Sequence, residues 1–261
     1  MAHLNPEFLT DAWGEAWVRR QPFAAAPVTP HLLGALSPGP GERILDVGTG
    51  AGPIALAAAR VVGPRGHVLA VDISPYLVKH VSRMAAAAGL ENLYILEADA
   101  ATANLPGGPF DALTSQMGVM FFADPVAAFT NLHRHLRPGG RLVVAAWGEA
   151  AANPLHHDVL RTLDDPGALS RLARQGPGPF SMAEPAATAT LLEQAGFQRA
   201  TDQRLALAAE VPIEAVIDAD ASVAARARVA EFEVGPGLIR APLTCVIYRT
   251  RSRPPRSANR S

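Results

Sequence analysis

Apolar runs that alternate with helical segments dominate the middle of the chain. Between these runs, apolar residues recur at the spacing of one helix face, which predicts helices over residues 53–62, 75–88 and 125–136. Strands that alternate with helices form parallel βαβ units, so we expect an α/β fold with helices on both faces of a sheet. The runs that predict its buried strands are Arg43–Val47, His67–Asp72, Asn92–Glu97, Phe110–Gln116 and Arg141–Trp147.

Capping signals set the expected limits of two of these helices. Ser74 and Asp124 each precede a proline, which is the usual order of an N-cap and a first helical position. Gly89 is expected to end the helix that begins after Ser74, and Met84 is predicted to lie on the buried face of that helix. Pro138-Gly139-Gly140 predicts a turn before the fifth strand.

The pattern weakens on both sides of this region. Before it, aromatic residues at near-helical spacing predict a helical cap, and several prolines predict a linker behind it. After it, we expect helices over residues 153–163, 184–195 and 213–232, and two more strands at Leu205–Val211 and Leu243–Tyr248. The chain then divides into a cap and linker at 1–40, a main domain at 41–250 with insertions near 148–183 and 213–240, and a disordered tail at 251–261.

Composition narrows the functions to consider. The 261 residues suit one large α/β domain, and 49% hydrophobic residues are enough for a sizeable core. A net charge of −1 and 6% aromatic residues argue against a nucleic-acid partner, which usually requires a basic surface and stacking platforms. The single cysteine, Cys245, excludes a disulfide framework within the chain and a zinc site built from cysteines.

Targeting and membrane signals also bear on the class of protein. The first residues, Met1–Thr10, show neither the basic nor the apolar region of a signal peptide. The longest apolar runs have about ten residues, short of the roughly 20 that a membrane-spanning helix needs. We therefore expect a cytoplasmic enzyme without membrane insertion, either a monomer or a homodimer, that acts on a small molecule.

A glycine-rich motif follows the first strand and opens the first helix. It reads Asp46-Val47-Gly48-Thr49-Gly50-Ala51-Gly52, and alternate glycines let the backbone turn sharply and approach a ligand. A dinucleotide fingerprint would require its third glycine at position 53, which is Pro53. A pyrophosphate gains nothing from a carboxylate two residues before the first glycine. A ligand that carries an ammonium group as well as a carboxylate does gain from an acid at that position. The methionine part of S-adenosylmethionine (SAM) carries both groups.

Further acids follow the next two strands. Asp72 ends the second strand, where an acid faces the same crevice and can accept both hydroxyls of a ribose. Ile73 comes next and is placed to pack on an adenine face. Asp99 follows the third strand, where its carboxylate can accept the adenine amino group. Acids after three consecutive strands therefore fit one extended, partly cationic nucleoside.

These motifs together resemble those of the class I SAM-dependent methyltransferases, in particular the group with the ubiquinone and menaquinone biosynthesis C-methyltransferases and many natural-product methyltransferases. The segments that carry the resemblance are Asp46–Gly52, Asp72, Glu97–Ala100 and Leu136–Leu142. The resemblance implies a Rossmann-like, seven-stranded mixed sheet in the order 3-2-1-4-5-7-6, with strand 7 antiparallel and SAM across the ends of strands 1 to 4.

The resemblance also assigns roles within the SAM site. Asp46 and Gly48 would serve the methionine part, Asp72 the ribose, and Asp99 with Ala100 the adenine, whereas Ser115–Met117 would flank the methyl donor. The predicted cofactor-binding residues are Asp46, Gly48, Thr49, Gly50, Gly52, Asp72, Ile73, Asp99, Ala100, Ser115 and Gln116.

Methyl transfer from a sulfonium is an in-line displacement that mainly needs alignment and, for some acceptors, removal of a proton. Between Ser115 and Asp124 the chain has no carboxylate of the kind that binds a catalytic metal, so we predict no metal. The same stretch lacks the Asn-Pro-Pro-Tyr motif of amide and adenine N-methyltransferases. Its Met and Phe residues predict an apolar pocket wall, although core packing explains them as well.

The sequence contains few candidates for catalytic residues. His156 and His157 follow the fifth strand, so one is a candidate general base, with a solvated helix face as the alternative. Gln116 is a candidate for orienting the acceptor. Trp13 and Trp17 either close over the site as a lid or belong to a helix that is simply docked on the sheet.

The expected function is methyl transfer from SAM to an O, N or C nucleophile of a small molecule in secondary or quinone-type metabolism. Two alternatives keep the same ligand: a SAM-assisted cyclisation or rearrangement, and a catalytically silent SAM-binding subunit of another enzyme. A nicotinamide-dependent oxidoreductase is a third alternative, which Pro53 disfavours.

Overall fold

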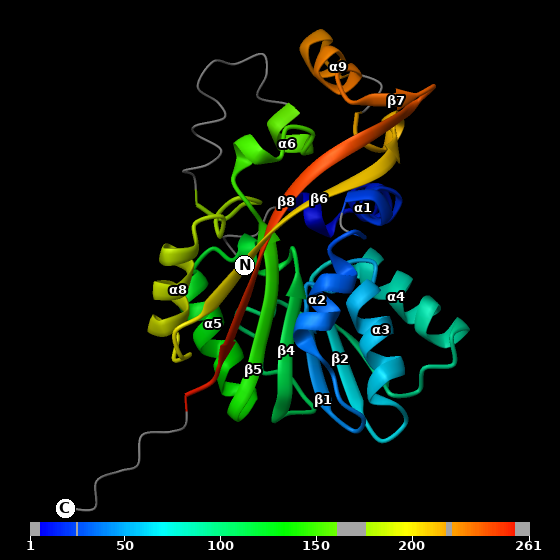
Figure 1. Ribbon diagram of the computed structural model, residues 1–261. Coiled ribbons are helices and arrows are strands. Elements are labelled where there is room, and N and C mark those ends of the chain that lie inside the picture. The colour runs from blue at the N-terminus through cyan, green and yellow to red at the C-terminus, as the bar shows by residue number, and fades with distance from the viewer. Residues whose placement is uncertain (1–5, 25, 161–175, 218–220, 254–261) are drawn as a thin grey trace, which may run out of the picture.

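The computed structural model describes residues 6–24, 26–160, 176–217 and 221–253. They form a single sheet with helices on both faces (Figure 1). The strands lie in the order β3-β2-β1-β4-β5-β8-β6, and β7 pairs with β8. Their bounds are β1 Arg43–Val47, β2 His67–Asp72, β3 Leu93–Glu97, β4 Phe110–Gln116, β5 Leu136–Trp147, β6 Thr201–Pro212, β7 Glu233–Gly235 and β8 Leu238–Arg251.

Helices cover the two faces in pairs. Helix α2 packs beside α3 on one face, and α5 packs beside α8 on the other (Figure 1). No helix in the described part of the chain is both long and apolar enough to cross a lipid bilayer. The α-helices are α1 Asp11–Ala24, α2 Thr29–Leu36, α3 Pro53–Val62, α4 Pro75–Ala87, α5 Pro125–Arg134, α6 His157–Leu160, α8 Pro185–Gln194 and α9 Val223–Ala230. The 3-10 turns are η1 Pro6–Leu9, η2 Val119–Phe121, η3 Ala150–Ala152 and η4 Ile213–Ala215.

The sheet confirms the expected topology. Strands β3, β2, β1, β4 and β5 run parallel, while β8 is antiparallel to both of its neighbours, β5 and β6. Strand β8 therefore takes the place of the seventh strand in the order 3-2-1-4-5-7-6, and the short β7 is an addition. Because β1 pairs with β2 on one side and β4 on the other, the order of the strands reverses at this point, where crevices open in doubly wound sheets.

Burial explains why the central strands read as nearly continuous apolar runs. Ile44, Leu45 and Leu113 are wholly buried, as expected for parallel strands covered on both faces. The edge is different. Strand β6 alternates between exposed and half-buried positions along most of its length, because only one of its faces is covered.

Of the two predicted N-caps, Asp124 makes a capping hydrogen bond and Ser74 does not. The Asp124 carboxylate accepts a hydrogen bond from the Ala127 N–H at 3.0 Å, so the predicted cap is confirmed. Ser74 holds the N-cap position of α4, but its side chain makes no capping bond, and its hydroxyl is buried without a partner among the described residues. Met84 was placed wrongly, since its side chain is 45% exposed and Ala85 occupies the buried face instead.

Three boundaries also differ from the expectation. Residues 136–140, expected to close a helix and make a turn, belong to β5, with an irregular register against β4 between Phe110 and Ala112. The expected linker contains α2, which buries Leu32 and Leu36 in the main core. The expected tail begins too early, because β8 reaches Arg251 and a bridge follows at Ser252. Residues 254–261 of that tail lie outside the described residues.

The segments after β5 are only partly as expected. The helix expected over 153–163 appears as α6, and its last three positions lie outside the described residues. The helix expected over 213–232 appears as η4 and α9. Strands β6 and β8 are longer than expected and continue beyond the end of β5 toward α9 (Figure 1). A second apolar cluster, with Val211, Val229 and Ile239 among its members, stabilises this extension.

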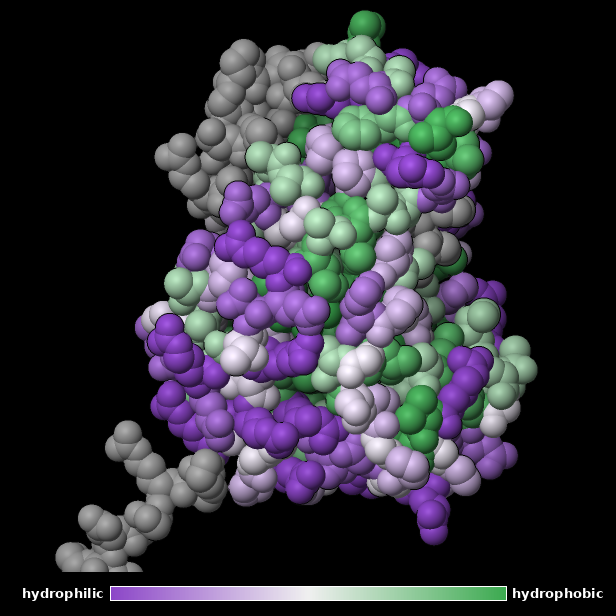
Figure 2. Space-filling model, in the orientation of Figure 1, coloured by the Kyte–Doolittle hydropathy of each residue, from purple (hydrophilic) through white to green (hydrophobic). Residues whose placement is uncertain are grey.

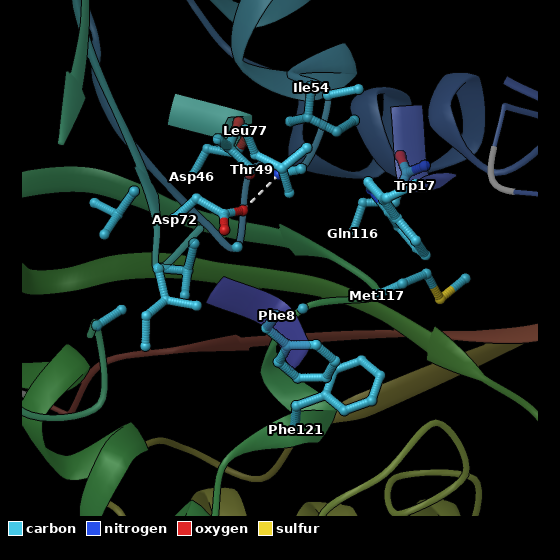
Figure 3. Close-up of a pocket in the computed structure, with 18 of the residues that line it drawn as sticks. Phe8, Trp17, Asp46, Thr49, Ile54, Asp72, Leu77, Gln116, Met117 and Phe121 are labelled. Atoms are coloured by element: carbon cyan, nitrogen blue, oxygen red, sulfur yellow. Dashed lines mark hydrogen bonds between the residues drawn. The ribbon is translucent and has the colours of Figure 1, made fainter. Parts of the chain in front are cut away.

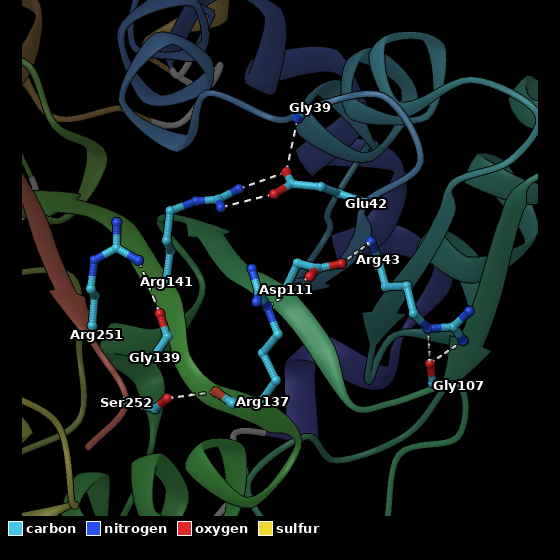
Figure 4. A network of polar contacts seen from close by, with 10 residues as sticks. All are labelled: Gly39, Glu42, Arg43, Gly107, Asp111, Arg137, Gly139, Arg141, Arg251 and Ser252. Atoms are coloured by element: carbon cyan, nitrogen blue, oxygen red, sulfur yellow. Dashed lines mark hydrogen bonds and ion pairs between the residues drawn. The ribbon is translucent and has the colours of Figure 1, made fainter. Parts of the chain in front are cut away.

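Polar contacts tie the amino ends of the strands together (Figure 4). The Arg141 guanidinium donates to both oxygens of Glu42, at 2.9 and 2.7 Å. Asp111 accepts from the Arg43 N–H at 2.8 Å and pairs with Arg137 at 2.7 Å. Because these contacts link β1, β4 and β5 at one end, the loops at their opposite, carboxyl ends are held in a defined register.

Hydrophilic and hydrophobic residues gather on different parts of the surface. Figure 2 shows hydrophilic surface over the lower part of the sheet and hydrophobic surface gathered in a hollow at mid-height. Exposed apolar surface that gathers in a hollow is typical of a ligand or partner site rather than of scattered surface residues.

Candidate functional site

The glycine loop after β1 takes the conformation that the sequence indicated. Gly48, Gly50 and Gly52 have φ values of +64°, +58° and +84°, in the left-handed region that favours glycine. Gly52 is the N-cap of α3, and Pro53 is its first residue. At these three positions the loop therefore presents backbone rather than side chains at the carboxyl end of the sheet.

The loop after β4 touches the loop after β1. A β-carbon placed on Gly48 would lie 3.0 Å from the Gly118 Cα atom. Between β4 and Gly118, Met117 has a φ of +60° and is almost wholly buried. A left-handed conformation is unfavourable for a side chain of this size, and such residues cluster at ligand sites.

Asp46 is almost wholly buried at the end of β1. Its Oδ2 atom accepts a hydrogen bond from the Thr49 hydroxyl at 2.8 Å. Its Oδ1 atom is buried and has no partner among the described residues. Burial raises the pKa of Asp46 to about 7, with a smaller contribution from the charge of Asp72. A buried acceptor that lacks a donor is suited to a cationic ligand group.

Asp72 is fixed by the backbone. Its Oδ2 atom accepts from the Gly50 N–H at 2.8 Å, and its Oδ1 atom accepts from the Ser74 N–H at 3.0 Å. Burial raises the pKa of Asp72. Each carboxylate oxygen has two lone pairs, so both keep the capacity to accept a further hydrogen bond. Asp99, after β3, accepts from the Ala101 N–H at 2.9 Å.

These groups line one crevice at the carboxyl ends of β1 to β4 (Figure 3). The cavity between them has a volume of about 150 Å³ and opens to solvent. The lining residues are Phe8, Trp13, Trp17, Asp46, Val47, Gly48, Thr49, Gly50, Ala51, Pro53, Ile54, Val71, Asp72, Ile73, Leu77, Ala98, Asp99, Ala100, Gln116, Met117, Gly118, Phe121 and Phe122.

Aromatic side chains form one wall of the crevice, and we call Phe8, Trp13, Trp17 and Phe121 the aromatic wall. The rings of Trp13 and Trp17 stack with centroids 5.7 Å apart and planes 8° apart. Phe8 lies 4.7 Å from Trp13 and meets Phe121 edge to face at 5.4 Å. The wall joins η1 and α1 to the turn after β4, so the expected N-terminal cap contributes directly to the crevice.

Most of the predicted cofactor residues come together here. Nine line the crevice, namely Asp46, Gly48, Thr49, Gly50, Asp72, Ile73, Asp99, Ala100 and Gln116. Gly52 does not, because it faces α4, where an added β-carbon would lie 3.0 Å from Val81. Ser115 does not either: it is wholly buried, and its hydroxyl accepts from the Val119 N–H at 3.2 Å. Both shape the loops rather than line the space.

The candidate catalytic residues differ in whether they line the crevice. Gln116 lines the crevice, and its Oε1 atom accepts from the Thr29 hydroxyl at 2.9 Å. His156 is not among the lining residues; its ring packs between Trp147 and Phe180, with centroids 5.1 and 5.0 Å away. His157 begins α6, and its side chain lies outside the described residues.

Several lining residues were not predicted. Leu77 was read only as part of a buried helix face, and Ile54 as part of an apolar helix. Both lie in the first turn of a helix that starts at the crevice, and that position is the signal that marks them. Phe8 reaches the crevice from η1 through long-range packing, which no local pattern reports. No group of three or more His, Cys, Asp or Glu side chains in the described part of the chain is arranged to hold a metal.

Comparison with known proteins identifies the domain. Residues 44–140 match the family model of a methyltransferase domain. Nocamycin O-methyltransferase of Saccharothrix syringae is 34% identical over 182 residues, which cover 66% of this chain and 64% of that protein. Demethylmenaquinone methyltransferase of Thermus thermophilus is 44% identical over 103 residues, 40% of this chain and 46% of that protein. The chain thus spans less than two thirds of either relative.

Solved structures share the fold. The YcgJ protein of Bacillus subtilis has a TM-score of 0.63 at 17% identity, covering 88% of this chain and 99% of that one. A SAM-dependent methyltransferase of Aquifex aeolicus has a TM-score of 0.57 at 18% identity, covering 92% and 98%. The glycine loop, the acids after β1 to β3 and the matched family model together show that this chain carries a class I methyltransferase domain whose cofactor is S-adenosylmethionine.

Proposed function

We propose that the protein transfers a methyl group from SAM to an O, N or C nucleophile of an apolar small molecule, without a metal. The observation that carries the proposal is one crevice that joins a glycine-and-acid cradle to the aromatic wall. The names of relatives agree with it, because nocamycin O-methyltransferase and the aklanonic acid methyltransferase of a Streptomyces strain, 34% identical over 116 residues, are both named for small molecules.

Within this proposal the cofactor lies across the strand ends. Asp46 and Gly48 hold the methionine part, Asp72 accepts from the ribose hydroxyls, and Asp99 with Ala100 binds the adenine. The residues fit the group, because the unpartnered Oδ1 atom of Asp46 offers an acceptor to an ammonium and both oxygens of Asp72 can accept a further hydrogen bond. SAM supplies an activated methyl group when bound.

The acceptor is proposed to lie against Phe8, Phe121 and Met117, with Gln116 orienting a polar group on it (Figure 3). Apolar rings bury an aromatic or polyketide-like surface and exclude water from the reacting atoms. The cap at 1–40, whose Phe8, Trp13 and Trp17 line the crevice, and the insertions near 148–183 and 213–240 are proposed to select the acceptor.

Proton removal points to the chemistry of the acceptor. In the described lining, the ionisable side chains are Asp46, Asp72 and Asp99, all assigned to the cofactor. We therefore favour an acceptor that ionises by itself, such as a phenol, an enol or a carbon acid between two carbonyls. His156 and His157 remain proposals for a base acting from outside this lining.

Label transfer tests the proposal. The protein is incubated with methyl-labelled SAM and a panel of phenolic and enolic acceptors, and products are followed by mass spectrometry. Label in an acceptor together with S-adenosylhomocysteine supports it. An acceptor that is cyclised or rearranged while SAM keeps its label would instead support a SAM-assisted rearrangement, and binding without turnover over a broad panel would support a silent subunit.

A further inference from the structure

The methionine part of SAM poses a charge problem for this crevice. It carries a carboxylate beside its ammonium group, and Asp46 is suited only to the ammonium. Carboxylates in proteins are usually met by Arg or Lys. The described lining of the crevice contains no Arg, Lys or His side chain. Among the described lining residues, only neutral donors are therefore available to the carboxylate, and the backbone of the glycine loop is one source.

Trp17 is the second source. It projects from α1 into the crevice beside Gln116 (Figure 3). Its indole nitrogen is buried and has no acceptor among the described residues. Buried N–H groups are almost always paired in folded proteins, so an unpaired one at a ligand site indicates an acceptor on the ligand. The same nitrogen would lie 2.9 Å from a β-carbon on Gly50, which places it directly over the glycine loop.

The position of this indole is set by close packing. Trp13, one helical turn earlier, stacks on it in parallel. Helix α1 itself lies close against α4, because a β-carbon on Gly14 would come within 2.7 Å of the Tyr76 ring. Glycines at 14 and 50 thus allow the two approaches that bring the indole to the loop. A donor held this firmly loses little entropy when it binds a ligand.

We propose that the Trp17 Nε1–H donates a hydrogen bond to the carboxylate of the methionine part of SAM. The indole would serve as a neutral substitute for the missing cation, so that Asp46 and Trp17 recognise the two ends of the zwitterion. The inference rests on the proposed placement of the cofactor along the glycine loop.

The test compares two ligands and two variants. The ligands are S-adenosylhomocysteine and its decarboxylated analogue, the aminopropyl thioether, which lacks only the carboxylate. Calorimetry measures the Kd of both for the unaltered protein, for Trp17→Phe and for Trp147→Phe. Phenylalanine keeps an apolar ring but has no donor. We expect Trp17→Phe to weaken S-adenosylhomocysteine binding by about 10- to 100-fold and to leave the binding of the analogue within a few-fold.

A control variant and two possible results decide between a hydrogen-bonding and a packing role of Trp17. Trp147→Phe makes the same change in β5, outside the lining of the crevice, and is expected to keep the original ratio of the two Kd values. Equal losses for both ligands in Trp17→Phe would show a packing role and overturn the proposal, as would unchanged binding. Failure of S-adenosylhomocysteine to bind the unaltered protein would overturn the proposed function and this inference together. Near-ultraviolet circular dichroism checks that the variant is folded.

Discussion

At the scale of single residues, the site depends on two buried carboxylates in different settings. Asp72 has backbone donors on both oxygens, whereas Asp46 has one oxygen with no donor among the described residues. The types and spacing of these acids were predictable, because they follow strands that end at one edge. Their hydrogen-bond partners were not, since the loop that supplies the Gly50 N–H is shaped by contacts with distant residues.

The raised pKa of Asp46 makes cofactor binding depend on pH. Burial favours the neutral carboxyl in the free protein, with a pKa of about 7, whereas an ammonium ligand requires the charged form. S-adenosylhomocysteine affinity should therefore fall as the pH is lowered through 7, approaching about tenfold per pH unit well below it. The measurement is calorimetry between pH 5.5 and 8.5.

The variant Asp46→Asn supplies the comparison. It has no charge to titrate, so its affinity should be weaker and nearly independent of pH. The raised pKa of Asp46 also affects stability. Because the pKa of Asp46 in the folded protein lies above its ordinary value of 3.8, the protonated carboxyl favours folding at low pH. That contribution is lost as the pH rises through about 7. A variant with the pH profile of the parent protein would contradict the assignment of Asp46.

Asp72 has two roles that a pair of variants can separate. Asp72→Ala removes the acceptor of two backbone N–H groups, so it should lose about 1–3 kcal/mol of unfolding free energy as well as cofactor binding. Asp72→Asn keeps one acceptor oxygen and should be closer to the parent in stability but about 10- to 100-fold weaker in binding. Urea unfolding and calorimetry measure the two effects. Unchanged affinity in both variants would contradict the ribose assignment.

At the scale of elements, the parallel βαβ units from β1 to β5 were the most predictable part, because their apolar runs and caps are local signals. Asp124 and Pro125 illustrate this, since cap and first turn follow from two adjacent residues. The extension of β6 and β8 was underestimated, because its half-buried positions are covered by a separate cluster formed with distant residues such as Val229. Ser115 was predicted to bind the cofactor, and the structure places it, wholly buried, outside the lining of the crevice.

The docking of α1 gives a prediction at this scale. Gly14→Ala places a methyl group 2.7 Å from Tyr76, so α1 should shift away from α4 and carry Trp13 and Trp17 with it. We expect weaker S-adenosylhomocysteine binding and a Tm lower by a few degrees, since about 1 kcal/mol shifts Tm by roughly 2–4 °C in a domain of this size.

Gly34→Ala is the matched control. It is also a helix position, in α2, but a β-carbon there meets nothing within 4 Å. Alanine is a better helix former by roughly 0.5–1 kcal/mol, so this variant should be as stable as the parent or more so, with unchanged affinity. Equal behaviour of the two variants would show that the fit of α1 against α4 is unimportant.

At the scale of the whole molecule, segments that are distant in sequence build one crevice together with the ends of β2 and β3. The β1 loop provides the cradle, η1 and α1 provide the aromatic wall, and the turn after β4 closes the space between them. The motif order identified the cradle from sequence alone. For Trp13 and Trp17 of the aromatic wall, the sequence left two alternatives open, a lid or a docked helix. The chain carries no local signal for where a helix at its beginning will pack.

The central claim is that this crevice is a SAM site and not a dinucleotide site, and a calorimetric titration tests it most directly. The unaltered protein is titrated with S-adenosylhomocysteine and, separately, with NAD under the same conditions. The structure predicts saturable one-to-one binding of S-adenosylhomocysteine, weakened by Asp72→Asn, and no measurable binding of NAD. Saturable binding of NAD with none of S-adenosylhomocysteine would contradict the account.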